Sequence, residues 1–293
     1  MGVDLDTRPT ASAADAPPLS RASRARDGRD DPAPVRGRTN GRGKGGKVLV
    51  RTGSVAVFFL LWQAASLWFG SRLCPGPVEV IGFIASETAS GELPYHLSVT
   101  LTRVAAAFLL AMSIGSVIGL LMGRSERANL VLEPWLILLL NAPALIVIVL
   151  AYIWIGLGET AAIAAVAINK IPNVTVTVRE GARAMDPALM EMARAYRFPR
   201  GSLTRDVMIP QLMPYLAAAA RSGLALIWKI VLVVELLGRS NGVGFQIHLY
   251  FQLFDVRAIL GYTLAFVAVM LVIEFAAVQP VERRAYRWRP RPA

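Results

Sequence analysis

The sequence has almost none of the residues that build disulfide frameworks or metal centres. Its single cysteine, Cys74, excludes an internal disulfide and a cysteine-based zinc site. Its two histidines, His96 and His248, are expected in different loops, where they cannot form a metal cluster. We therefore expect no metal site and no bound cofactor.

Charged residues are also scarce, at 17% of the 293 residues, while 55% are hydrophobic. A soluble domain of this length is less apolar and more charged. The apolar residues fall into about six runs of roughly 20 residues, the length of a helix that crosses a bilayer, and barrel strands would be shorter and alternating. The sequence predicts an all-α membrane protein with six transmembrane helices, at residues 50–70, 97–122, 130–154, 159–178, 212–237 and 258–279.

The net charge of +11 is concentrated at the two ends and in short connections, which does not indicate a nucleic-acid-binding surface. Such charges set the orientation of spans and contact anionic lipid headgroups. With the N-terminus inside, 24 of the 31 Lys and Arg residues lie in inner segments, so both termini are predicted to be cytoplasmic. We expect a disordered basic tail at 1–47, a transmembrane domain at 48–282 and a second basic tail at 283–293.

Two of the predicted spans carry small residues or proline at informative positions. Gly115, Gly119 and Gly123 recur every four residues in the second span, which favours close packing against another helix. Pro143 lies near the middle of the third span and should kink or interrupt it. A break beside a transport pathway and a break that only serves packing are both compatible with the sequence.

Five ionisable residues fall at membrane depth and should face protein or water rather than lipid: Arg103, Lys170, Arg221, Lys229 and Glu235. On the fifth span Arg221, Lys229 and Glu235 lie within about 120° of one another, and we expect this stripe to face away from lipid. It lines a pathway for anions or makes structural ion pairs. Lys229 is the most central pathway candidate, and Glu235, nearer the outer end, pairs or closes a gate. Arg221 and Pro143 complete the candidate pathway set.

The longest inner connection, about residues 180–210, is charged but has the pattern of ordered structure. Asp186-Pro187 is a favourable helix start, and "ALMEMARAY" continues it with one apolar face. Phe198-Pro199 should end or bend that helix. The element could lie on the membrane surface, form a plain loop, or dock in a groove of a soluble partner.

The same segment carries a family pattern. Glu191, Met192 and Ala193, followed by Ile209-Pro210, resemble the EAA loop of ABC importer permeases. Other stretches resemble the nitrate/sulfonate/taurine branch of these permeases and extend the resemblance over residues 50–282: "GPVEV" (76–80), "HLSVTLTRVAAAFLLAMSIGSVIGLLMGRSE" (96–126), "GLGET" (156–160) and "ELLGRSNGVGF" (235–245).

The resemblance implies a type I ABC importer transmembrane-domain fold in a bacterial inner membrane. It implies a second permease copy (a homodimer), a cytoplasmic ATPase subunit that hydrolyses the ATP, and a periplasmic substrate-binding protein. The solute would be a small anion of the nitrate, sulfonate or taurine type. The implied coupling-loop residues are Glu191, Ala193, Arg194, Arg197, Gly201 and Pro210.

One position departs from the family pattern. Arg197 stands where the family has Gly, and a left-handed backbone conformation costs free energy at a residue with a side chain. Phe198-Pro199 could supply the bend by another route.

The alternative function is a secondary transporter or channel driven by ion gradients. It fits less well because the chain is short, shows no inverted repeat and has no series of carboxylates for protons or sodium. An intramembrane enzyme would need convergent catalytic groups, whereas the charges here are isolated on separate spans. We therefore expect no catalytic residues.

Overall fold

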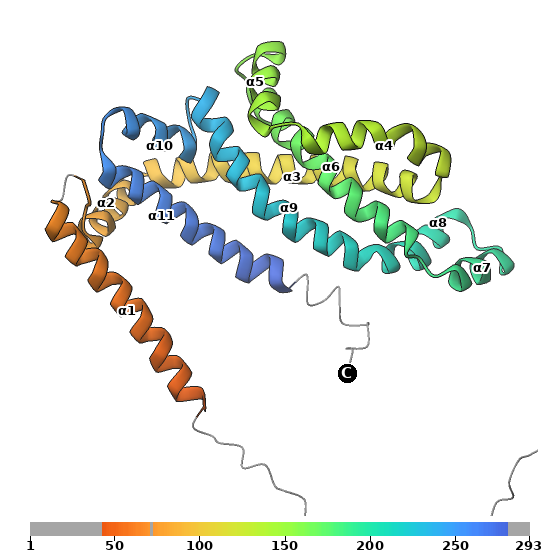
Figure 1. Ribbon diagram of the computed structural model, residues 1–293, viewed down its shortest axis with the longest axis horizontal. Helices are drawn as coiled ribbons and strands as arrows, with labels where there is room; N and C mark the ends of the chain where they lie inside the picture. The colour runs from red at the N-terminus through yellow and green to blue at the C-terminus, as the bar shows by residue number, and fades with distance from the viewer. Residues whose placement is uncertain (1–42, 71–72, 281–293) are drawn as a thin grey trace, which may run out of the picture. The chain divides into compact units, whose positions relative to one another are not determined.

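A computed structural model of the chain describes residues 43–70 and 73–280, and within these ranges every regular element is a helix (Figure 1). The chain divides into two units after Arg51; α1 spans this boundary, and the other helices belong to the second unit. Of the tails predicted at 1–47 and 283–293, residues 1–42 and 283–293 lie outside the described residues, and residues 43–47 belong to α1. The elements, with η marking π-helical turns, are α1 (Gly43–Phe69), α2 (Pro77–Ser90), α3 (Glu92–Arg124), α4 (Glu126–Asn141), α5 (Ala144–Ile155), α6 (Glu159–Arg183), α7 (Pro187–Ala195), α8 (Arg200–Ser202), η1 (Leu203–Met208), α9 (Ile209–Gly238), α10 (Val243–Gln252), α11 (Val256–Ile273) and η2 (Glu274–Val278).

Four helical segments of the described chain are long and apolar enough to cross a membrane: Glu92–Arg124, Glu159–Arg183, Leu203–Gly238 and Val256–Ala276. They coincide with the predicted second, fourth, fifth and sixth spans. The bent pair α4 and α5 would make a fifth span, and the apolar part of α1, Gly53–Phe69, is shorter than the others.

The predicted third span is interrupted rather than continuous. α4 ends at Asn141, α5 begins at Ala144, and the two helices are bent by 99°. Ala142 is extended (φ −68°, ψ 124°), as expected before proline, and Pro143 then takes the N-cap position of α5. The break predicted at Pro143 is therefore confirmed.

Two short helices were not predicted, and the placement of the histidines in loops was wrong. α2 precedes α3, and α10 lies between α9 and α11; neither contains a run of apolar residues long enough to indicate a span. His96 lies in the first turns of α3 and His248 lies in α10. Gly76 followed by Pro77 at the first helical position, with Glu79 in the first turn, was the available signal for α2.

The helix α6 is the centre of the fold, with α3 packed along it on one side and α9 on another (Figure 1). The glycines of α3 make this close approach possible. A Cβ atom on Gly115 would lie 2.7 Å from Val174 Cβ, and one on Gly119 would lie 2.6 Å from the Thr175 carbonyl oxygen. The predicted helix packing at the glycine repeat is thus confirmed, and α6 is its partner.

Candidate functional site

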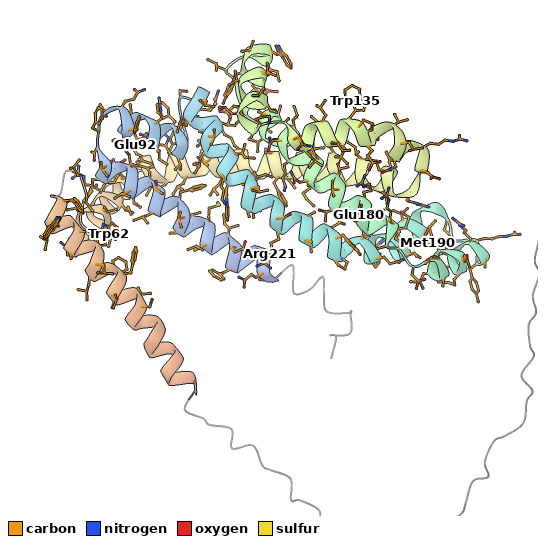
Figure 2. The ribbon with its side chains drawn as sticks, viewed as in Figure 1. Trp62, Glu92, Trp135, Glu180, Met190 and Arg221 are labelled. Carbon is orange, nitrogen blue, oxygen red and sulfur yellow. The ribbon has the colours of Figure 1, made fainter. Side chains whose placement is uncertain are left out.

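The segment between α6 and α9 begins with a capped helix, as the sequence predicted. Asp186 Oδ1 accepts a hydrogen bond from Ala188 N at 2.8 Å, and Pro187 occupies the first helical position of α7. The helix runs to Ala195. It lies at the end of α6 where α9 begins; Met190 marks it in Figure 2.

The C-terminus of α7 forms a Schellman motif around Arg197. The Phe198 N–H donates to the Ala193 carbonyl at 3.0 Å, and the Arg197 N–H donates to the Arg194 carbonyl at 3.0 Å. Arg197 itself has φ of +50°, in the left-handed region that glycine normally occupies. The chain therefore turns at Arg197, at a cost in backbone strain, rather than by the other route expected at Phe198-Pro199.

Arg197→Gly is expected to stabilise the protein by about 0.5–1 kcal/mol. Glycine removes the strain of the left-handed backbone, and this gain exceeds the larger loss of backbone entropy that glycine suffers on folding. The thermal unfolding midpoint in detergent should rise by roughly 1–3 °C. Arg194→Gly, in the last turn of α7, where the backbone is right-handed, is the matched control and should lower the midpoint. A midpoint for Arg197→Gly below that of the wild type would contradict the strain at this residue.

The outward surface of this element combines charge with large apolar side chains. Glu191 and Arg194 are exposed, and Ala193 is buried. Three neighbouring apolar residues are also exposed: Met192 (38%), Tyr196 (75%) and Phe198 (38%). A solvated loop would not keep so much apolar area in water, so the surface is suited to contact with another protein or with lipid.

The element is fixed to the helices on either side of it. The Asp186 N–H donates to Gln211 Oε1 at 2.8 Å, and Gln211 Nε2 donates to the Val207 carbonyl at 3.1 Å. Gly181, near the end of α6, leaves room for the Tyr215 ring of α9, since a Cβ there would lie 2.5 Å from Tyr215 Cγ. The segment that carries α7 is therefore held against α9 and follows directly on α6.

The remaining predicted loop residues lie at the start of the next helix. Gly201 is in α8, with open space where a Cβ would be. Pro210 is in the first turn of α9, and η1 joins α8 to α9 without a break. π-Helical turns of this kind are frequent at functional sites.

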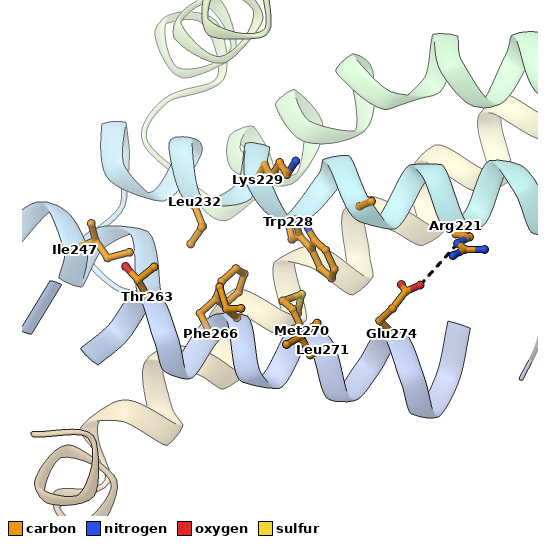
Figure 3. Close-up of a pocket in the computed structure, with 12 residues that line it drawn as sticks. Arg221, Trp228, Lys229, Leu232, Ile247, Thr263, Phe266, Met270, Leu271 and Glu274 are labelled. Atoms are coloured by element: carbon orange, nitrogen blue, oxygen red, sulfur yellow. Dashed lines mark ion pairs between the residues drawn. The ribbon is translucent and has the colours of Figure 1, made fainter. Parts of the chain in front are cut away.

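Two of the predicted pathway residues border a cavity of about 480 Å³ between α9 and α11. Its walls are mostly apolar, with Trp228 and Phe266 among them, and Arg221 closes one end through an ion pair with Glu274 (Nε to Oε1, 3.7 Å). Figure 3 shows the Lys229 amino group directed away from α11, so only its stem borders the cavity.

Glu235 lies elsewhere, in a buried ion pair at the C-terminal end of α9. Its side chain is fully buried, and Arg103 Nη1 of α3, itself 3% exposed, lies 2.6 Å from Glu235 Oε1. Arg103 also holds Glu159 at the start of α6 (Nη2 to Oε1, 2.6 Å) and donates to the Asn241 carbonyl at 2.9 Å. Arg239 pairs with Glu159 from the other side. This Arg103 cluster is at the opposite end of α6 and α9 from α7.

The second carboxylate oxygen of Glu235, Oε2, also accepts hydrogen bonds, so both oxygens of the buried carboxylate have partners. Thr100 Oγ1 lies 3.0 Å away, and the Gly244 N–H donates to it at 2.8 Å. Gly242 (φ +105°) packs directly on this carboxylate, where no larger residue fits. The turn after α9 thus packs against the Glu235 carboxylate and supplies part of the hydrogen bonding that a buried charge needs.

The three ionisable residues of the fifth span therefore do not share one environment. Arg221 and Lys229 are exposed in this chain, whereas Glu235 is covered by α3 and α10. Their environments differ because the neighbours of α9 change along its length, and the expectation that all three residues face away from lipid stays a prediction. Sequence reasoning noted Arg103 and Glu235 separately and missed Glu159, Arg239 and Asn241. The motifs "GLGET" and "ELLGRSNGVGF", which contain these three residues, were the sequence feature that could have pointed to them.

Residues 97–278 match the family described as "Binding-protein-dependent transport system inner membrane component". The chain belongs to this family. It is 30% identical to the putative aliphatic sulfonates transport permease protein SsuC of Bacillus subtilis (strain 168), over 80% of this chain and 85% of that protein. It is 24% identical to the taurine transport system permease protein TauC of Escherichia coli (strain K12), over 83% of this chain and 90% of that protein.

A solved structure of the same fold is that of an amino acid ABC transporter with histidines. It has a TM-score of 0.56 and 21% identity, and the match covers 69% of this chain and 98% of that one. Family membership settles the choice between the two transport functions: the chain is a multi-pass inner-membrane permease of the ABC importer type, and not an enzyme.

Proposed function

We propose that two copies of this chain form the transmembrane pathway of an importer for a small anion of the sulfonate, taurine or nitrate type. A separate cytoplasmic ATPase supplies the energy, and a periplasmic binding protein delivers the solute. The observation that carries this proposal is α7: an exposed helix with a charged and apolar surface, bonded to α9 and joined to α6. Such an element is suited to receive force from another protein.

The proposed coupling works through short, stiff connections. Glu191, Ala193, Arg194, Arg197, Gly201 and Pro210 belong to the segment that would seat in a groove of the ATPase. When the ATPase closes, α7 moves, and α6 and α9 move with it because of the Asp186–Gln211 bond and the Gly181–Tyr215 contact. Their opposite ends meet at the Arg103 cluster, so a displacement at the inner face reaches the outer face.

In the proposed topology α1 is the first of six spans, and the bent pair α4 and α5 is the third. Both termini are cytoplasmic, since 24 of the 31 Lys and Arg residues then lie inside. The transmembrane domain covers about 48–282, flanked by basic tails at 1–47 and 283–293. This orientation places α7 on the side of the ATPase.

The proposed substrate class rests on the names of the relatives and on cations at membrane depth. The relatives include permeases for aliphatic sulfonates, taurine and nitrate. Arg221 places a positive charge at one end of the cavity, Lys229 adds a second charge on α9 directed away from it, and Pro143 interrupts the third span. We assign Glu235 a structural role at the outer end, because its carboxylate is already paired.

Proteoliposomes with the complete assembly test the function. Uptake of labelled methanesulfonate is expected only with ATP accessible to the ATPase and the binding protein on the opposite side. Collapsing ion gradients with ionophores should leave uptake in place. Accumulation by the permease alone on a proton or sodium gradient would refute the proposal.

A further inference from the structure

Lys170 is buried in the middle of α6. The residue is 2% exposed, and its stem lies under α9, where a Cβ on Gly223 would be 3.2 Å from Lys170 Cε and 3.8 Å from Phe108 Cε2. At 1.5 Å per residue it is about 16 Å from the start of α6 and about 20 Å from its end. Among the described residues, none forms a hydrogen bond or an ion pair with its amino group.

An ammonium on a side chain this deeply buried, with no carboxylate beside it among the described residues, is costly, and an anion bound in the assembled protein would lower that cost. The acidic residues nearby already form ion pairs: Glu235 and Glu159 with Arg103, and Glu274 with Arg221. A second copy of the chain brings the same residues and so, within the described ranges, no free carboxylate at this depth. Lipid phosphates lie at the bilayer surfaces, beyond the reach of a lysine at half depth.

We propose that Lys170 binds the anionic group of the transported solute, a small oxyanion such as a sulfonate, at half depth in the permease. The inference rests on the proposed function and adds a binding residue to it. Lys170 lies on α6 and the Gly223 that covers it lies on α9, so the proposed motion of these two helices with α7 changes the access of the ammonium to the pathway. A desolvated single charge gives an affinity that is favourable for entry yet weak enough for release.

The binding step is tested on the purified assembly with its ATPase, by thermal unfolding in sodium methanesulfonate against sodium chloride of equal ionic strength. The wild type should gain roughly 2–4 °C at about ten times the dissociation constant. Lys170→Met should lose this shift, and Lys170→Arg should keep part of it. Arg257→Met removes an exposed cation of α11 and should keep the whole shift.

The same variants separate binding from a structural role. Without methanesulfonate, Lys170→Met should unfold at the wild-type temperature or above, because no partner is lost; a lower midpoint would show a structural partner and overturn the proposal. An unchanged methanesulfonate shift in Lys170→Met, or no shift in the wild type up to about 100 mM, would also overturn it. Failure of the wild-type permease to retain the ATPase would instead count against the proposed function.

Discussion

Arg103→Met is expected to lower the free energy of unfolding by about 3–5 kcal/mol, the largest stability effect predicted for this protein. Glu235 would lose its cation while remaining fully buried, with only Thr100 and the Gly244 N–H to support its charge. Methionine fills most of the volume, so the loss reports the missing charge rather than a cavity. The measurement is the thermal unfolding midpoint in detergent, which should fall on the order of 10 °C.

The double variant Arg103→Met with Glu235→Met distinguishes pairing from packing. Removing both charges should restore most of the stability, because Glu159 is half exposed and can be solvated once Arg103 is gone. Glu159→Gln is the matched control; it breaks a bond to the same guanidinium but should cost no more than about 1 kcal/mol. If the loss of unfolding free energy in the double variant equalled the sum of the losses in the two single variants, the ion pair would not be the source of the effect.

The parts of the fold that could be predicted are those encoded within one stretch of chain. Apolar runs indicated the long helices, and Pro143 indicated the break in the third span. Asp186-Pro187 predicted the start of α7, and the glycine spacing of α3 predicted a close helix contact. Each of these signals depends on residues within a few turns of one another.

The Arg103 cluster could not be predicted in this way. Arg103 and Glu235 are 132 residues apart, and helical periodicity gives the direction of a side chain but not the element that covers it. For this reason Arg221 and Glu235, about 40° apart around α9, differ so strongly in burial. Arg197 shows a different limit: backbone preference disfavours a left-handed arginine, and the packing of the surrounding segment overrides it.

Glu191→Lys is expected to abolish retention of the ATPase by the permease, the largest functional effect predicted. Glu191 is exposed on α7, so the reversal should leave the fold intact while placing a positive charge where the docking surface has a negative one. Loss of a partnered charge and the new repulsion together cost at least about 2 kcal/mol at an interface, which weakens binding by roughly 30-fold or more. The measurement is co-purification of the ATPase with the tagged permease, together with ATP-driven uptake.

The matched control is Glu126→Lys, which makes the same charge change on an exposed residue at the start of α4, outside the coupling element. It should retain the ATPase, so a loss confined to Glu191→Lys assigns the docking surface to α7 and, because the ATPase is cytoplasmic, assigns α7 to the cytoplasmic side. Normal co-purification with Glu191→Lys would remove α7 from the docking surface. Equal losses in both variants would mean that net charge at the inner face, and not this helix, governs the association.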